Sequence, residues 1–206
     1  MMTKYLSDKE QIEIIKKKWW RDCSRAIVTI IVVGFLTSFG WLYWHRFQIE
    51  KTERASQIYT KLQAATLRNQ QDESQKLTNE LMKGYAKTPY AAMAALLVAK
   101  DDVKKNHLDR ALIHLQWVIE NSLIRSLKQI ARLRAARILL VQNHLEKALK
   151  LLQVLDNPIY HPLVDSVKGD IYLAMGKQAS AKQFYTAAQN GMKALGIDDP
   201  YLAMKI

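Results

Sequence analysis

Hydrophobic residues follow two different patterns along this chain. From Ala26 to Trp44, nineteen consecutive residues carry no charge, in the order AIVTIIVVGFLTSFGWLYW. From Phe47 onward, apolar residues recur every three or four positions in blocks of 12–22 residues, with no strand-like alternation between them. The second pattern is typical of amphipathic helices packed on one another. The sequence therefore predicts an all-α fold in which one N-terminal segment differs from the rest.

The uncharged run is long enough to cross a membrane. Nineteen helical residues rise about 28 Å, close to the roughly 30 Å of a bilayer's hydrocarbon core. Aromatic residues stand at both of its ends, as interfacial belts do: Trp19, Trp20, Trp41, Tyr43 and Trp44. A buried core helix would normally keep a polar face, and a cleaved signal peptide would have a shorter apolar region before a pair of small residues. We therefore predict an uncleaved transmembrane helix over residues 26–44.

The charges that flank this run predict its orientation. Five cations precede it (Lys16, Lys17, Lys18, Arg21 and Arg25), and three follow it (Arg46, Lys51 and Arg54). The excess of positive charge stays on the cytoplasmic side of membrane helices, so we expect residues 1–25 to form a cytoplasmic basic tail. Residues 45–206 then form a domain outside the cytoplasm. The single cysteine, Cys23, would lie on the reducing side.

A short pattern recurs three times in the second half of the chain. Asn106–Leu112 reads NHLDRAL, Asn143–Leu149 reads NHLEKAL 37 residues later, and Gly176–Lys182 begins 33 residues after that. Seven positions before each turn stands a small residue: Ala99, Ala136 or Gly169. Three positions recur at helical spacing after each turn: Ala111, Leu115 and Val118; Ala148, Leu152 and Leu155; Ala181, Tyr185 and Ala188. Stacked helical hairpins explain this spacing, although a helical bundle with chance similarity would share part of it.

Breaks between the helices are predicted at eight places. They are Asn69–Asp72, Lys87–Pro89, Lys105-Asn106, Asn121-Ser122, Gln142-Asn143, Asp156–Pro158, Met175-Gly176 and Asn190-Gly191. Thr88 is expected to cap a helix whose first residue is Pro89. Gly176 is expected to supply a left-handed turn. The period resembles the tetratricopeptide repeat of about 34 residues, with Val167–Ala188 as the best copy and leucines in place of aromatics in the earlier, degenerate ones.

This order of segments resembles the YfgM-type ancillary subunits of the SecYEG translocon, over nearly the whole chain. The resemblance is carried by Gln11–Glu13, Trp19-Trp20, Gly40–Trp44, Pro89–Leu96, Leu133–Leu139 and Gly169-Asp170 with Gly176. It implies a single-pass, type II signal-anchor protein of the bacterial inner membrane with a periplasmic tetratricopeptide-like domain. It further implies three partners: the translocon, an associated periplasmic chaperone or isomerase, and exported polypeptides. This chain is more basic than such domains often are, and the family supplies no catalytic residue or cofactor.

Repeat geometry suggests where a polypeptide would bind. The first helix of each hairpin lines the concave surface of a solenoid, which predicts these groove residues: Met93, Leu96, Lys100, Val103, Ile130, Leu133, Arg137, Leu140, Leu163, Ser166, Asp170 and Leu173. Most are apolar, and Lys100 and Arg137 stand at equivalent places. The favoured hypothesis is a chaperone-like binding module for exported chains. The alternative is an envelope scaffold, of the cell-division or pilus-assembly type, with one fixed folded partner.

Two further surfaces are candidates for contacts. Arg125, Lys128 and Arg132 share a helix face. Three interpretations of this face are open: it is simply solvated, it contacts anionic headgroups or an acidic partner, or it binds nucleic acid. Base-stacking aromatics do not interleave with these cations, so we expect no nucleic acid. Gly34 and Ser38 form a small-x-x-x-small pair that would suit contact with another membrane helix.

Composition and motifs argue against an enzyme. Lys and Arg outnumber Asp and Glu by 31 to 19, which gives a net charge of +12, and 49% of residues are apolar. The five histidines (His45, His107, His114, His144 and His161) do not form the paired helical spacing of a metal site. No nucleophile elbow or phosphate-binding glycine loop occurs. We therefore expect no catalytic residue, metal, cofactor or small-molecule substrate.

Overall fold

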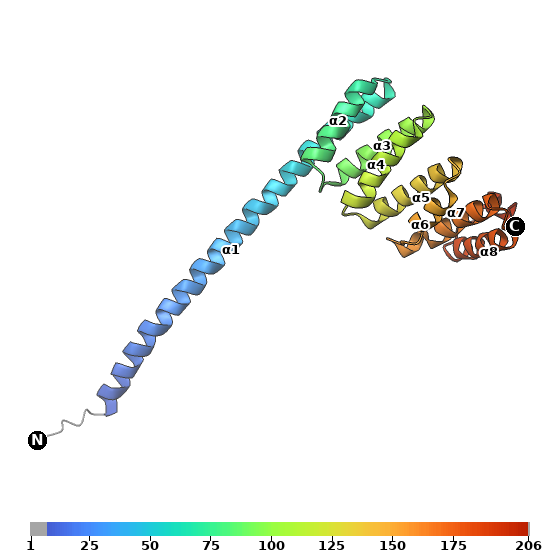
Figure 1. The fold of residues 1–206 in the computed structure, drawn as a ribbon. Coiled ribbons are helices and arrows are strands. Elements are labelled where there is room, and N and C mark those ends of the chain that lie inside the picture. The colour runs from blue at the N-terminus through green and yellow to red at the C-terminus, as the bar shows by residue number, and fades with distance from the viewer. Residues whose placement is uncertain (1–7, 206) are drawn as a thin grey trace, which may run out of the picture. The chain divides into compact units, whose positions relative to one another are not determined.

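Helices form all the regular structure of residues 8–205, the part of the chain that the computed structural model describes (Figure 1). Their order is α1 (Asp8–Leu67), α2 (Gln71–Gly84), α3 (Pro89–Lys104), α4 (Leu108–Asn121), α5 (Arg125–Val141), α6 (Leu145–Leu151), the 3-10 turn η1 (Pro158–Tyr160), α7 (His161–Ala174), α8 (Gln178–Ala194) and α9 (Pro200–Ala203). Before residue 45, described side chains are those of Ile12, Glu13, Lys16, Trp19, Trp20, Gly34, Phe35, Leu36 and Trp41. The all-α prediction is confirmed.

The chain divides into two units, Met1–Glu50 and Lys51–Ile206. The transmembrane helix predicted over residues 26–44 falls in the first unit, inside α1, and most of its side chains lie outside the described residues. Part of the predicted tail, residues 1–7, lies outside them as well. Among the residues that are described, no helix is both long and apolar enough to span a bilayer.

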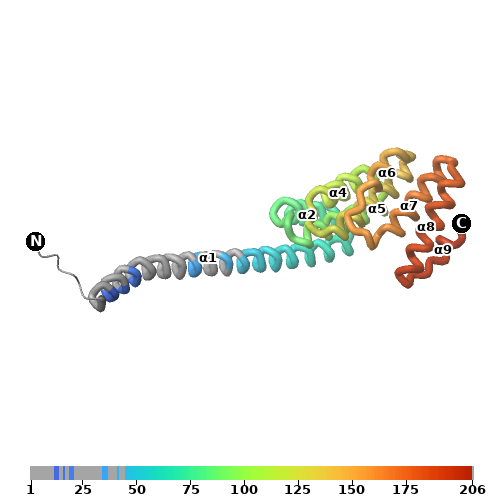
Figure 2. The backbone as a smooth tube through the Cα atoms, turned by 90° about the horizontal axis from the view of Figure 1, so that it is seen from below, coloured from blue at the N-terminus to red at the C-terminus, as the bar shows by residue number. Residues whose placement is uncertain are grey.

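The second unit is a stack of helical hairpins. Helix α3 packs on α4, α5 on α6, and α7 on α8, and consecutive hairpins also touch (Figures 1 and 2). The end of α1 shares a buried cluster with α2 and α3, through Ala55, Leu62 and Ala65. Further clusters lie between α3, α4 and α5, between α5, α6 and α7, and around α8. Each cluster is therefore built from helices that are neighbours in sequence.

The three predicted turns share one backbone conformation. Asn106, Asn143 and Gly176 have positive φ angles of 60°, 59° and 74°. At each turn, the following amide donates a hydrogen bond back across the helix end: His107 N to Asp102 O at 2.8 Å, His144 N to Leu139 O at 2.8 Å, and Lys177 N to Tyr172 O at 2.9 Å. This is the Schellman closure, which needs a left-handed residue and so selects Asn or Gly. The predicted turns are confirmed.

The predicted break at Asn69–Asp72 is a further turn of this kind, although the repeating pattern was recognised only in the three later turns. Asn69 has a φ of 55°, and Gln70 N donates to Ala65 O at 3.0 Å. The repeat was missed because Ser74 and Thr78, both buried, stand where the later copies have alanine and a large apolar residue. The Thr78 hydroxyl is accommodated because it donates to the Ser74 carbonyl at 2.8 Å.

One local prediction is wrong, and another is confirmed only in part. Asn190-Gly191 is not a break, because α8 continues through it to Ala194 and the chain turns at Gly196 instead, with a φ of 72°. Gly191 serves packing, since a Cβ there would lie 2.6 Å from Cγ of Pro162. Thr88 does stand before Pro89 at the start of α3, but its hydroxyl donates to the Tyr85 carbonyl and accepts no bond from the helix.

Candidate functional site

A recess of about 630 Å³ opens between α3 and α5, the first helices of two consecutive hairpins. We call it the basic groove, and it is lined by Ala99, Lys100, Val103, Lys104, Asn106, Leu108, Leu115, Arg134, Arg137, Ile138 and Val141. Lys100, Val103 and Arg137 belong to the predicted groove residues, and the structure brings these three together. Its volume falls in the range of common ligand sites, roughly 300–1,000 Å³.

The groove combines an apolar base with charged edges. Ala99, Leu115 and Ile138 are buried, whereas Val103 and Val141 are 42% and 75% exposed. Lys100 and Lys104 on α3, and Arg134 and Arg137 on α5, are all exposed. Arg134 also reaches across to α3, where its Nη1 donates to the Leu96 carbonyl at 3.4 Å. The arrangement can hold an apolar side chain while cations contact anionic groups beside it.

Two of the predicted groove residues belong to the core instead. Leu96 is 7% exposed and packs in the cluster of α3, α4 and α5, and Leu133 is 5% exposed and packs in that of α5, α6 and α7. Their position in a first helix does not expose them, because the next hairpin covers that side of the helix. Neither leucine can offer its side chain to a ligand.

The remaining predicted groove residues lie outside the recess. Partly buried against core clusters are Ile130, Leu140 and Leu163. Met93 and Leu173 are 37% and 50% exposed, and Ser166 is half-buried. Their role in polypeptide binding stays a prediction.

Asp170 fastens the C-terminal end of the solenoid. Its Oδ1 accepts a hydrogen bond from Oη of Tyr185 at 2.9 Å, and it forms a 2.6 Å ion pair with Nζ of Lys205. Burial raises the pKa of the Tyr185 hydroxyl above its usual value, and the Asp170 carboxylate acts in the same direction. The predicted ligand contact through Asp170 would therefore compete with these internal bonds.

The three cations predicted to face an anionic surface are not equivalent. Arg125 is exposed and Lys128 is half-buried, but Nε of Arg132 lies 2.6 Å from Oδ2 of Asp156. This ion pair ties α5 to the segment between α6 and α7, where Gln129 also accepts a bond from the Asp156 amide at 2.7 Å. Arg132 is thus a structural cation rather than part of an open basic face.

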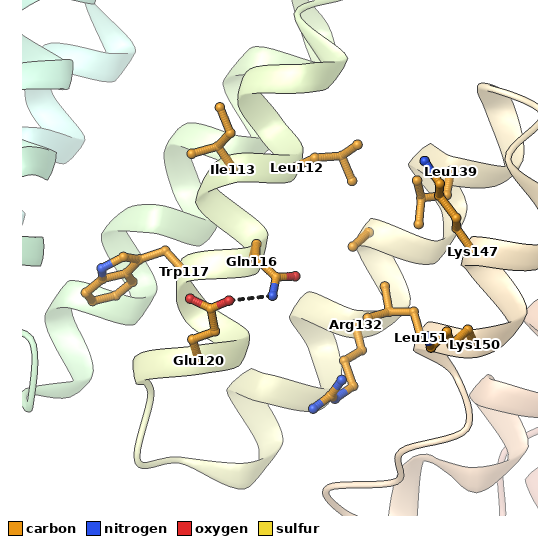
Figure 3. Close-up of a pocket in the computed structure, with 11 residues that line it drawn as sticks. Leu112, Ile113, Gln116, Trp117, Glu120, Arg132, Leu139, Lys147, Lys150 and Leu151 are labelled. Atoms are coloured by element: carbon orange, nitrogen blue, oxygen red, sulfur yellow. Dashed lines mark hydrogen bonds between the residues drawn. The ribbon is translucent and has the colours of Figure 1, made fainter.

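A second cavity, of about 780 Å³, lies among α4, α5 and α6. Figure 3 shows its α4 side chains, which include Ile113 and Glu120, on one side and those of α5 and α6 on the other. Gln116 donates to Glu120 at 2.6 Å, and Lys147 and Lys150 line the α6 side. Arg132 contributes to this cavity and not to the basic groove.

A buried carboxylate at the α3–α4 turn was not anticipated. Asp102 is 4% exposed, and its oxygens lie 3.0 Å from Nη2 of Arg110 and 3.6 Å from Nε2 of His114. Burial lowers the pKa of the His114 imidazole, although the Asp102 carboxylate acts in the opposite direction. Across the described side chains, no three His, Cys, Asp or Glu residues gather as metal ligands would.

The membrane-helix contact predicted for Gly34 and Ser38 concerns α1. Gly34 is exposed, and the side chain of Ser38 lies outside the described residues. That contact stays a prediction.

Comparison with known proteins places this architecture in a family. The family described as "Tetratricopeptide repeat-like domain" matches residues 17–206. A protein of Aggregatibacter actinomycetemcomitans named "Ancillary SecYEG translocon subunit" is 30% identical over 193 residues, which cover 93% of each chain. The chain belongs to the family of ancillary SecYEG translocon subunits with a tetratricopeptide repeat-like domain. A relative with the same name in Haemophilus influenzae is 29% identical over 90% of each chain. Another in Escherichia coli is 25% identical over 89% of this chain and 87% of the relative. No solved structure matches the chain.

The relatives are named as ancillary subunits of the translocon, and the matching family is described by its tetratricopeptide-like repeats. The resemblance drawn from the sequence is therefore confirmed at the level of the family. Two residues of the basic groove, Lys104 and Arg134, were not among the predicted groove residues. A usable signal existed for both, since Lys104 follows Lys100 by four residues and Arg134 precedes Arg137 by three, and such pairs share a helix face.

Proposed function

We propose that this chain is a membrane-anchored subunit associated with the Sec translocon, which binds exported polypeptides in a chaperone-like manner. The observation that carries the proposal is the basic groove between α3 and α5, which offers an apolar base and exposed cations to an extended chain. The names of the relatives support the association with SecYEG. An exported segment, a periplasmic chaperone or isomerase, and the translocon are the expected partners.

The uncharged run Ala26–Trp44 supports the anchoring part of the proposal. Its length, its aromatic ends and the cations before it fit a single span with the N-terminus in the cytoplasm of a bacterium. The repeat domain would then face the periplasm, where polypeptides leave the translocon. A tether at this place raises the effective concentration of the domain near emerging chains.

Site-specific photocrosslinking in native membranes tests this function. A photoreactive residue replaces Val103 in the basic groove while a model secretory protein is arrested in the translocon. We expect an adduct with the arrested polypeptide. The matched control carries the same group at Val154, which is 48% exposed and lies outside the groove. If position 103 instead forms one stoichiometric adduct with a folded envelope protein, whether or not export is active, the scaffold alternative is correct.

A further inference from the structure

The basic groove contains an uncompensated cluster of positive charge. Lys100 and Lys104 line it from α3, and Arg134 and Arg137 line it from α5, while no Asp or Glu lines it. All four cations are exposed, and in the described part of the chain none of them forms an ion pair with a carboxylate. The groove therefore has four charged donors that the protein's own acids do not neutralise.

The acids nearest in sequence are engaged elsewhere. Asp101 pairs with Lys105 at 2.7 Å, and Asp102 pairs with Arg110 at 3.0 Å. Asp109, at the start of α4, accepts a hydrogen bond from Nε2 of Gln142 at 2.9 Å. Asp101 and Asp102 thus have cationic partners outside the groove, and none of these three acids lines it, so its cations are left for an external anion.

The spacing of the cations suits a polypeptide whose acids alternate with another residue. Lys100 and Lys104 are four residues apart on a helix, which is a rise of about 6 Å. Side chains two residues apart in an extended chain point the same way and lie about 7 Å apart. The intervening apolar surface includes Val103 and Ile138. No aromatic side chain lines the groove, so base stacking would have no platform there.

We propose that the basic groove selects extended acidic segments in which two carboxylates and an apolar side chain stand at alternate positions, so that all three share one face. The apolar side chain enters the recess between α3 and α5, and the carboxylates accept charge-assisted hydrogen bonds from the lysines and arginines at its edges. This inference rests on the proposed function, because it names the class of segment that the polypeptide-binding site prefers. It replaces a mainly apolar trough with a site in which charge decides selectivity.

Three matched peptides test the selectivity on the full-length protein in zwitterionic nanodiscs. Each has a Glu-Ser-Glu-Ser-Leu, Gln-Ser-Gln-Ser-Leu or Glu-Ser-Glu-Ser-Ser centre in the same Gly/Ser sequence, and fluorescence anisotropy gives the Kd. We expect the first to bind about tenfold or more tightly than either of the others at physiological salt, with a preference over the Gln peptide that shrinks as salt rises. Equal affinity for the first peptide and the Gln peptide overturns the inference, whereas the crosslink from position 103 judges polypeptide binding itself.

A charge-matched pair of variants locates the effect. Lys100→Gln with Arg137→Gln should abolish the preference for Glu over Gln. Lys147→Gln with Lys150→Gln removes the same charge from the exposed edge of the second cavity and should leave the preference intact. An equal loss of this preference in both variants would mean that the peptide is held by general charge attraction, and it would overturn the assignment of the preference to the basic groove. Displacement of the peptide by phosphatidylglycerol vesicles would assign the groove to lipid headgroups and would overturn it as well.

Discussion

At the scale of single residues, the Asp102 carboxylate shows how the solenoid accommodates a buried charge. The carboxylate is surrounded by Arg110, His107 and His114, which come from the α3–α4 turn and from α4. Arg110 and His107 also contact each other. Only Arg110 keeps a full positive charge at every accessible pH, so it balances the carboxylate without protonation of His114. His114 can therefore stay neutral in the folded protein.

We predict that the protein loses stability as the pH is lowered, because of His114. Its folded pKa is lowered below the usual value of 6.5, so the unfolded state takes up a proton that the folded state resists. Stability from this residue is complete above 6.5 and is lost as the pH falls below it. The melting temperature of the full chain should decrease between pH 7.5 and pH 5, and this decrease should be smaller in His114→Gln than in the wild type. His144→Gln, an exposed residue at the equivalent turn, is the control. An unchanged decrease in His114→Gln would contradict the prediction.

At the scale of elements, hairpin packing depends on the small residue that stands seven positions before the turn. Ala99 and Ala136 are buried, and Gly169 meets the ring of Tyr185 so closely that a Cβ would lie 2.5 Å from Cδ1. The ring has little room to move because its hydroxyl is bonded to Asp170 and its side chain is buried. The close approach of α7 and α8 therefore requires glycine at this position.

Replacing Gly169 with alanine should loosen this hairpin. Overpacking a close contact costs about 1–3 kcal/mol, so we expect a lower melting temperature for Gly169→Ala by circular dichroism. Gly84→Ala is the matched control, because a Cβ at Gly84 meets no atom within 4 Å and alanine is the better helix former. Equal melting of Gly169→Ala and the wild type would show that α7 and α8 separate without cost.

Local chemistry explains which of these features the sequence predicts. Turns in the left-handed conformation favour Asn or Gly, and these residues in the recurring pattern predicted three of the turns. A break was predicted at Asn69, but the repeat that follows it was not recognised because Ser74 and Thr78 are polar. The groove was predicted only in part, since Leu96 and Leu133 face neighbouring hairpins whose rotation no single-helix pattern records. Arg132 is paired with Asp156, which lies 24 residues away in sequence, and helical periodicity cannot show such a contact.

At the scale of the whole molecule, orientation in the membrane follows from the proposed anchor. A reporter that is active only in the periplasm, fused after Ile206, should be active in the full-length protein. Neutralising the five cations of residues 16–25 should send part of the population into the opposite orientation, because the remaining charge bias reverses. Neutralising Arg46, Lys51 and Arg54 is the control and should leave reporter activity unchanged. An inactive reporter on the unmodified chain would contradict the periplasmic assignment.

The separation of the buried clusters along the chain bears on how the domain would fold during its own export. Each buried cluster among the described residues joins helices that are close in sequence, and none of these clusters includes a helix from the far end of the chain. Contacts of such short range favour fast folding and let repeats form one after another. If the repeat domain is exported as proposed, the part that follows the membrane anchor emerges first and can complete the α1–α3 cluster before α8 has emerged. The basic groove, which needs only α3, α4 and α5, would be in place while the last hairpin is still being translocated.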